Sequence, residues 1–538
     1  MGGVTYSTGT GTSEKPSHAT AMDTSASAYL DAHGVQQALR DAVAHVVRTR
    51  PANPISAISD FMKAQAKPTS VDPRGLVDTN KDQAVDPATA ATAHSLVTNP
   101  SSLDLTSLTE LSLKKAGISH VPPAIGLCTC VKRLEISLNP QLNDLPEEMR
   151  GMQSLRILFG LGCSFKHVPP VVGALPSLYM LSFKSNQLTT IAEGALAPSL
   201  QWLILTDNQL TVLPRTLPTG LRKVMLTNNR LTSLPPTILH CTNLELIRLA
   251  DNQLSALPDG MLAMPNLSWM GLAGNPLVTS SAADALPPPK WIRDDEIDVH
   301  EQIGAGGGGF VHRASWRPAP GRPTGPDVAL KIFRGAGTVT DGDPRHEIDL
   351  GSVLQHPNVI RVLGASPAPR LGLVLELLDT RETWAELGGP PNFDTCTRDT
   401  YAPGTTFPAS KVLRTLRGVA AACAHLHAKR FTHGDLYAHN TLVERLSGEA
   451  KVGDFGAAYH YAPLGAAAAP AIERLEVRAF ACMAEELMEL LAPPVSEAEP
   501  LVEALAPLIS KCTRSEVLRR PSFDEIVAEL GEVLPSKM

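Results

Sequence analysis

A leucine-centred repeat runs through the middle of the chain and constrains its fold more than any other feature. Successive copies begin 21 to 24 residues apart and follow the frame L-x-x-L-x-L-x-x-N-x-L. A repeat of this length predicts one short strand per copy, with the leucines inward and the asparagine bonding the turning backbone. Stacked copies bury a continuous core, so we expect a curved solenoid over residues 101–285. The copies begin at Leu108, Val131, Leu155, Leu178, Leu200, Leu221, Leu244 and Leu267.

The frame is clearest at Leu200, Leu203, Leu205, Asn208 and Leu210. Eight copies in phase resemble the leucine-rich repeat family, which implies an α/β solenoid that binds other proteins. Positions outside the leucine frame of each strand then point to the concave face. Aromatic and arginine side chains are favoured anchors for a protein ligand. The outward positions of the middle repeats supply both kinds: Gln201, Trp202, Ile204, Arg222, Lys223, Met225, Glu245, Leu246 and Arg248.

Two apolar stripes at helical spacing precede the repeats. The first includes Val35, Leu39 and Val46, and the second includes Ile58 and Phe61. They predict a helical hairpin over residues 26–66. A hairpin of this size buries too little apolar surface to be stable alone, so we expect it to dimerise as a four-helix bundle. Packing against the rest of the chain is the alternative.

The segment Arg50-Pro51-Ala52-Asn53-Pro54-Ile55 links the two stripes. With the residues from Ala28 onward it resembles the Dpy-thirty dimerisation motif. That resemblance implies a homodimer through residues 28–65 whose groove docks an amphipathic helix. Ser56 and Ala57 replace the bulkier pair expected next in that motif, which leaves the shape of the groove open. Composition predicts disorder for residues 1–25 and a linker for residues 67–100.

The bulk composition excludes several classes of protein. A net charge of −7 over 538 residues gives no electrostatic reason to expect nucleic acid or an anionic membrane as partner. The sequence has no apolar run long enough for a membrane span. Its eight cysteines follow no disulfide framework, which predicts reduced thiols and an intracellular, cytoplasmic protein. The family of the hairpin adds an axonemal or a nuclear address as alternatives.

The strongest chemical signal lies in the C-terminal half. Asp435 is followed five residues later by Asn440, and Asp454 then opens an Asp-Phe-Gly turn. The first Asp is suited to accept or orient the proton of an attacking hydroxyl. The Asn and the second Asp supply oxygen ligands for Mg²⁺ between the phosphates of ATP. Two separate motifs at a workable distance predict a phosphoryl-transfer site.

A glycine-rich run and a strand-borne lysine come before these motifs. Residues 304–311 read G-x-G-x-x-G-x-V, and Lys331 ends the run Val-Ala-Leu-Lys. Glycines let backbone N–H groups approach phosphates, and the lysine neutralises them. Glu347 is the candidate partner of Lys331. Residues 373–378 predict a buried strand that runs into a hinge, with Leu375 as the gatekeeper next to adenine.

Together these segments resemble the eukaryotic-type protein kinases over residues 297–535, and we take residues 296–535 as that domain. The resemblance implies a bilobal α+β fold that uses ATP and Mg²⁺ to phosphorylate a protein, with a serine or threonine as the favoured acceptor. It makes Asp435 the catalytic residue, Asn440 and Asp454 the metal ligands, and Lys331, held by Glu347, the phosphate ligand. The implied nucleotide-binding positions are Gly304, Gly306, Gly309, Val311, Ala329, Lys331, Glu376 and Leu378.

The catalytic loop departs from the family in three places. Gly434 stands where the family carries an arginine that reads a phosphate on the activation loop. Without that arginine, control by activation-loop phosphorylation lacks its charge partner. Tyr437 replaces the lysine of serine/threonine kinases, and His439 stands where one class of tyrosine kinases has arginine. Neither substrate signature is complete.

The activation segment is also short. Glu476 follows Asp454 by twenty-two residues and takes the place of the usual Asp at the start of the long C-lobe helix. The segment lacks a clear Ala-Pro-Glu. Arg520 matches the late arginine of the C-terminal lobe. These departures concern recognition of the protein substrate rather than binding of ATP.

Two hypotheses from different classes follow. The first is an active kinase that needs no loop phosphorylation, with a dimeric hairpin and protein-binding repeats. The second is a dimeric scaffold whose kinase fold binds ATP without catalysing transfer, and the short activation segment favours it. The repeats likewise have an alternative role as a spacer or as a platform packed on the kinase domain.

Overall fold

The computed structural model describes residues 87–98, 100, 104–279, 286–306, 308–317, 325–334, 342–351, 353–492 and 495–533. The chain divides into two units after Leu76, and all described residues belong to the second unit. The predicted disordered segment 1–25 and the predicted hairpin 26–66 therefore lie outside the described residues.

Helix α4 (Pro87–Thr98) forms within the range that composition predicts to be linker. Its alanine-rich sequence favours a helix, and Pro87 occupies the first position, where proline is tolerated. The Leu96 side chain is 1% exposed and belongs to the core of the repeats. The helix packs beside the turn η2 (Pro123–Leu127). It therefore acts as a cap on the first repeat, which a solenoid needs to cover its terminal core.

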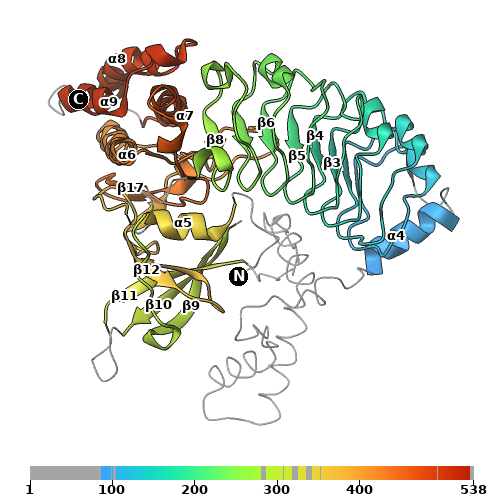
Figure 1. The fold of residues 1–538 in the computed structure, drawn as a ribbon, viewed down its shortest axis with the longest axis horizontal. Helices are drawn as coiled ribbons and strands as arrows, with labels where there is room; N and C mark the ends of the chain where they lie inside the picture. Colours follow the sequence, from blue (N-terminus) through green and yellow to red (C-terminus); the bar gives the residue numbers. More distant parts are fainter. Residues whose placement is uncertain are drawn as a thin grey trace, which may run out of the picture. The chain divides into compact units, whose positions relative to one another are not determined.

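The repeats form a parallel sheet that has eight strands in the described part of the chain, each paired with the next in sequence order (Figure 1). Every strand begins two residues after a predicted repeat start, so the repeat region is confirmed. Short 3₁₀ turns connect many of the strands. The strands are β1 (Glu110–Ser112), β2 (Arg133–Glu135), β3 (Ile157–Phe159), β4 (Met180–Ser182), β5 (Trp202–Ile204), β6 (Lys223–Met225), β7 (Leu246–Arg248) and β8 (Trp269–Gly271).

Buried asparagines hold the turn after each of several strands. The Asn208 amide nitrogen donates to the carbonyl oxygens of Phe183 and Leu205, both at 2.9 Å, and its oxygen accepts from the Leu188 N–H at 3.0 Å. One side chain thus joins neighbouring repeats and satisfies backbone groups that are cut off from water. The same arrangement recurs at Asn139, Asn186, Asn229, Asn252 and Asn275.

The C-terminal half has two lobes. The first is an antiparallel sheet with strand order β12-β13-β11-β10-β9, accompanied by helix α5 (Pro344–Gly351) (Figure 1). A small apolar core that includes Val328, Leu330 and Val374 lies within this sheet. The strands are β9 (Ile297–Ala305), β10 (Gly309–Trp316), β11 (Asp327–Phe333), β12 (Val362–Ser366) and β13 (Gly372–Glu376).

The second lobe is mainly helical. Helix α6 (Ala409–Ala428) lies at its centre and contacts α7 (Ala469–Glu489), α8 (Val495–Cys512) and α9 (Phe523–Glu532). None of the helices that the structure describes is both long enough and apolar enough to cross a bilayer. Short strands β14 (Trp384–Glu386), β16 (Thr441–Glu444) and β17 (Ala450–Val452) form one small sheet, and β15 (Phe431–Thr432) pairs with β18 (Tyr459–His460).

The last repeats pack directly on this helical lobe. Strand β8 and turn η6 (Met261–Ala263) contact helix α7. Met225, Leu246 and Trp269, which project from the concave face, belong to the same buried cluster as the core of the helical lobe. Residues predicted to face an external protein therefore contact the chain's own second lobe, so the solenoid serves as a platform packed on this domain.

Candidate active site

The predicted lysine–glutamate pair forms between β11 and α5. The Lys331 ammonium lies 2.7 and 2.9 Å from the two carboxylate oxygens of Glu347, and 2.9 Å from Oδ1 of Asp454. Burial alone would lower the pKa of Lys331, but the charges of Asp454 and Glu347 outweigh it and raise that pKa. The charge of Lys331 in turn holds the pKa of Asp454 below its usual value. Lys331 and Asp454 are therefore both charged at neutral pH.

The glycine-rich turn between β9 and β10 lies over this pair. The Gly306 N–H donates to the Gly309 carbonyl at 2.9 Å. A Cβ atom built on Gly308 would lie 3.8 Å from the Lys331 ammonium, and one on Gly309 would lie 2.2 Å from the Ile332 carbonyl oxygen. Only glycine fits the second position. The turn therefore brings backbone close to the lysine, as phosphate binding requires.

A cavity of about 250 Å³ opens between the two lobes at this point. The predicted gatekeeper Leu375 and the hinge residues Glu376 and Leu378 form one wall. The Glu376 carboxylate is held by the Lys451 ammonium at 2.8 Å and by the Arg361 N–H at 2.9 Å. Further lining residues include Val311, Ala329, Lys331, Glu347, His439, Asn440, Asp454 and Phe455. Gly304 pairs with Val311 at its edge.

The catalytic loop holds its two predicted polar residues together. The Asn440 amide nitrogen donates to the Asp435 backbone carbonyl at 2.9 Å and to its carboxylate Oδ2 at 3.1 Å. His433 Nε2 lies 3.0 Å from the Gly453 carbonyl oxygen, which ties the loop to the segment that carries Asp454. The Asp454 backbone has φ 55°, a left-handed conformation that costs energy and is often found at functional sites.

Helix α7 begins at Ala469, so Glu476 lies about two turns inside it rather than at its start as predicted, and it anchors the same loop. Its carboxylate accepts from the Thr432 hydroxyl at 2.7 Å and from the Gly434 N–H at 2.9 Å, and lies 2.8 Å from His427 Nε2. Burial would raise the pKa of Glu476, but the hydrogen bond and charge of His427 outweigh it and lower that pKa. The longer glutamate thus performs the anchoring expected of the family's aspartate.

Sequence reasoning missed the contribution of residues 388–402. Asp399 is buried, and its Oδ1 lies 2.6 Å from Nδ1 of His439, while its Oδ2 accepts from the Ala438 N–H at 2.5 Å. Asp399 therefore orients the histidine that lines the cavity beside Asn440. No motif marks this segment, because its role depends on contacts with residues about 40 positions away.

The solenoid touches the catalytic loop itself. The Arg248 guanidinium forms an ion pair with Oδ1 of Asp435 and donates to the Gly434 carbonyl at 2.7 Å. Trp269 stacks on Tyr437 with ring centroids 4.5 Å apart, and its indole N–H donates to the Leu436 carbonyl at 2.9 Å. Arg520, the late arginine of the C-terminal lobe, is buried and connects the repeats to helix α7. Its guanidinium donates to the carbonyl oxygens of Pro265 in the repeats and Arg474 in α7.

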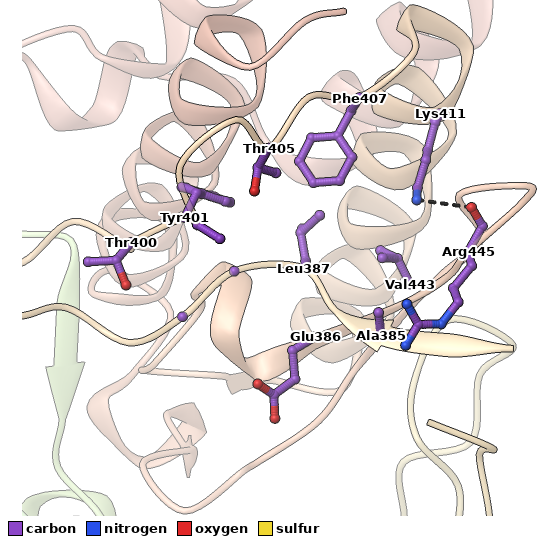
Figure 2. A pocket seen from close by; sticks show the side chains of 13 residues that line it. Ala385, Glu386, Leu387, Thr400, Tyr401, Thr405, Phe407, Lys411, Val443 and Arg445 are labelled. Atoms are coloured by element: carbon purple, nitrogen blue, oxygen red, sulfur yellow. Dashed lines mark hydrogen bonds between the residues drawn. The ribbon is translucent and has the colours of Figure 1, made fainter. Parts of the chain in front are cut away.

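A larger cavity of about 660 Å³ lies between β14 and the start of α6 (Figure 2). Leu387, Tyr401 and Phe407 line it, and the Lys411 ammonium at its edge donates to the Arg445 carbonyl at 3.2 Å. Its described lining includes no residue of the catalytic loop. Size alone therefore does not identify the site, and the smaller cavity carries the chemistry.

Comparison with protein families agrees with this geometry. Residues 297–481 match the family model for protein tyrosine and serine/threonine kinases, and residues 219–277 match a leucine-rich repeat model. The chain contains a protein kinase domain and leucine-rich repeats. Each of these matches covers well under half of the chain.

Individual relatives are kinases of both acceptor classes. The chain is 27% identical over 276 residues to a probable serine/threonine-protein kinase, SIS8 of Arabidopsis thaliana, over 44% of this chain and 25% of that protein. It is 30% identical over 180 residues to an Aurora kinase of Dictyostelium discoideum, over 33% of this chain and 41% of the relative. It is 29% identical over 190 residues to the human non-receptor tyrosine-protein kinase TNK1, over 34% of this chain and 26% of that protein. The chain thus spans less than half the length of each of these relatives.

Proposed function

We propose that the chain is a protein kinase that transfers the γ-phosphate of ATP to a serine or threonine hydroxyl. One observation carries this proposal: Lys331, Glu347 and Asp454 form a charged cluster at the same cavity that Asn440 lines. Phosphoryl transfer depends mainly on positioning and charge neutralisation, and this cluster provides both. The similarity to a probable serine/threonine-protein kinase of Arabidopsis thaliana supports the choice of acceptor.

The donor set fits Mg²⁺. Asn440 turns its amide nitrogen to Asp435, which leaves its oxygen as the atom for a cation. The Asp454 side chain is 52% exposed and uses one oxygen for Lys331. Carboxylate and amide oxygens are the ligands that this ion prefers. When bound, Mg²⁺ would neutralise charge on the phosphates.

The chain's own residues perform the remaining tasks. Lys331 would hold the α- and β-phosphates, and Glu347 would hold Lys331 in place. Asp435 would take or orient the proton of the acceptor hydroxyl. The backbones of Glu376 and Leu378 would meet adenine at the hinge, and Gly304, Gly306 and Gly309 would let the loop close over the phosphates.

Transfer of radiolabelled phosphate from Mg²⁺-ATP to casein and to the chain itself tests this function. We expect label with the wild type and none with Asp435→Asn or Lys331→Met, and a Lys429→Met variant at an exposed position serves as control. Acid hydrolysis of the labelled band identifies the acceptor residue. Binding of ATP without any transfer would replace the kinase by a nucleotide-binding scaffold, the second candidate, which the Arg248–Asp435 contact favours.

The N-terminal region adds a separate proposal. We propose that residues 28–65 dimerise through the Dpy-type hairpin, that its groove docks an amphipathic helix, and that the repeats bind a further protein. The apolar stripes at Val35 and Ile58 support dimerisation. Light scattering of the full chain should give a dimer mass, and deletion of residues 28–65 should give a monomer. An unchanged mass would contradict this proposal.

All eight cysteines are free thiols, which supports an intracellular address.

A further inference from the structure

We propose that the last repeats hold the protein-substrate side of the active site closed, with Arg248 in the place where an acceptor hydroxyl must meet Asp435. This inference rests on the proposed kinase function. It predicts that the chain phosphorylates protein only after the concave face leaves the catalytic loop. The nucleotide side stays accessible throughout.

The first argument is that both carboxylate oxygens of Asp435 are already engaged. Oδ2 accepts from Asn440, as the catalytic geometry requires, and Oδ1 is ion-paired with the Arg248 guanidinium. Arg248 is 3% exposed at its side chain, and it is also bonded to the Gly434 carbonyl. A general base must have an oxygen within hydrogen-bond reach of the proton it accepts. Arg248 occupies that oxygen.

The second argument is that no space is left for a polypeptide between the solenoid and the loop. A Cβ atom built on Gly434 would lie 2.6 Å from the Ala457 carbonyl oxygen and 2.9 Å from the Met270 carbonyl oxygen. Met270 belongs to β8, so the solenoid backbone lies directly against the catalytic loop. Gly434 has φ 70°, and it replaces the arginine of the family. The loss of that side chain therefore permits this close approach.

The third argument is that further contacts hold the solenoid against the kinase domain. Trp269 is 1% exposed and Tyr437 is 4% exposed, and the two rings are parallel within 5°. Farther along the face, Arg222 bonds Glu245 at 3.0 Å, Glu245 accepts from the Thr397 hydroxyl, and the Lys223 ammonium donates to the Cys396 carbonyl at 3.4 Å. The same face that covers Asp435 also holds residues 388–402 of the kinase domain.

The nucleotide cavity is not covered in this way. Among the described residues that line it, none comes from the repeats. Closure is therefore selective for the acceptor side: ATP can enter at all times, while a protein substrate reaches Asp435 only in the fraction of molecules in which the repeats have left the catalytic loop. A collapse of the whole cleft would not leave the Lys331–Glu347 pair assembled.

The test compares Arg248→Ala with Arg230→Ala in the full chain. Arg230 is an exposed arginine of the same solenoid. We expect Arg248→Ala to phosphorylate casein about 5- to 150-fold faster than wild type, the usual range for one coupled contact. We also expect faster hydrogen exchange in residues 433–440. Arg230→Ala should match wild type in both measurements, and Arg248→Ala combined with Asp435→Asn should transfer nothing.

Each outcome separates the two proposals. If Arg248→Ala matches Arg230→Ala in transfer and in exchange, closure is wrong while the kinase function stands on the label in the wild type. If the loop exchanges faster but neither variant transfers phosphate in the presence of Mg²⁺-ATP, the kinase function is wrong. Binding of ATP, measured by the shift in melting temperature, should be equal in wild type, Arg248→Ala and Arg230→Ala, and a difference would overturn the selectivity of closure.

Discussion

The two sides of the active site differ in what completes them. In the part of the chain that the structure describes, the nucleotide side is lined by residues of the kinase domain alone, with Lys331 and Glu347 already paired at 2.7 Å. The acceptor side is completed by the solenoid, which supplies Arg248 and Trp269 to the catalytic loop. The nucleotide side is thus arranged for its ligand, whereas the acceptor side is occupied by the chain's own repeats. The difference shows that an intact set of catalytic residues does not by itself imply an accessible site.

The largest expected effect comes from a substitution that disrupts the nucleotide side and leaves the acceptor side unchanged. Glu347→Gln removes a charge from Lys331, and we expect phosphate transfer to fall about 100-fold, as for loss of one positioned electrostatic group. Exchange in residues 433–440 should not change, because the solenoid contacts remain. An exposed glutamate, Glu382→Gln, is the control. Retained activity would show that Asp454 alone positions the lysine.

The second prediction concerns the close approach at Gly434. Gly434→Ala adds a Cβ atom against two backbone oxygens, so the solenoid or the loop must move. We expect the free energy of unfolding to fall by about 1–3 kcal/mol more than in Gly404→Ala, the usual range for overpacking. Gly404 has a similar φ of 81° but no atom within 4 Å of its Cβ position. Equal losses in urea denaturation would mean that only backbone strain matters.

The third prediction opens the acceptor side without touching Arg248. Trp269→Ala removes the stack on Tyr437 and the hydrogen bond to the Leu436 carbonyl, so the repeats should leave the catalytic loop more often. We expect casein phosphorylation to rise about tenfold, at the lower end of the range for a coupled contact. Trp291→Ala, at a tryptophan that is 51% exposed, should leave the rate unchanged. A lower rate in Trp269→Ala would instead make this ring part of a productive site.

The smallest expected effect is a pH dependence of stability, which tests the electrostatic role of residues 388–402. Burial, and then the charge of Asp399, raise the pKa of Glu486 to about 7 from its usual 4.5. The folded state therefore binds this proton more tightly, so the contribution of Glu486 to stability is greatest below pH 4.5 and is lost as the pH rises through about 7. The slope should not exceed about 1.4 kcal/mol per pH unit. Glu486→Gln should flatten the decline in urea titrations, and Glu489→Gln, at an exposed position, should keep it.

Much of the fold was predictable because its determinants are local in sequence. Each described strand of the solenoid begins two residues after a predicted repeat start, since the repeat encodes inward and outward positions by spacing alone. The kinase residues were predictable for a similar reason. Lys331, Asp435, Asn440 and Asp454 stand at spacings that the chemistry requires. In the structure Lys331, Asn440 and Asp454 line one cavity, and Asn440 is hydrogen-bonded to Asp435.

The occupant of the concave face was not predictable from the sequence. The outward positions of Arg222, Lys223, Glu245 and Arg248 were identified, but a pattern of exposed side chains does not say which surface covers them. That answer depends on contacts between residues up to 187 positions apart. Helix α4 was missed because its alanines are interspersed with polar residues, while its packing on the repeats is seen in the burial of Leu96 and in the contact with η2.

The glycine at position 434 has a consequence for how such a chain can evolve. Its missing side chain is useful only while Met270 lies against it, and the ion pair of Arg248 with Asp435 forms only while the repeats lie on the catalytic loop. The repeats and the kinase domain are therefore not interchangeable modules. Recombination that brings in repeats from another protein would lose the match, so descendants of this chain should inherit positions 248, 269, 434 and 437 as one set.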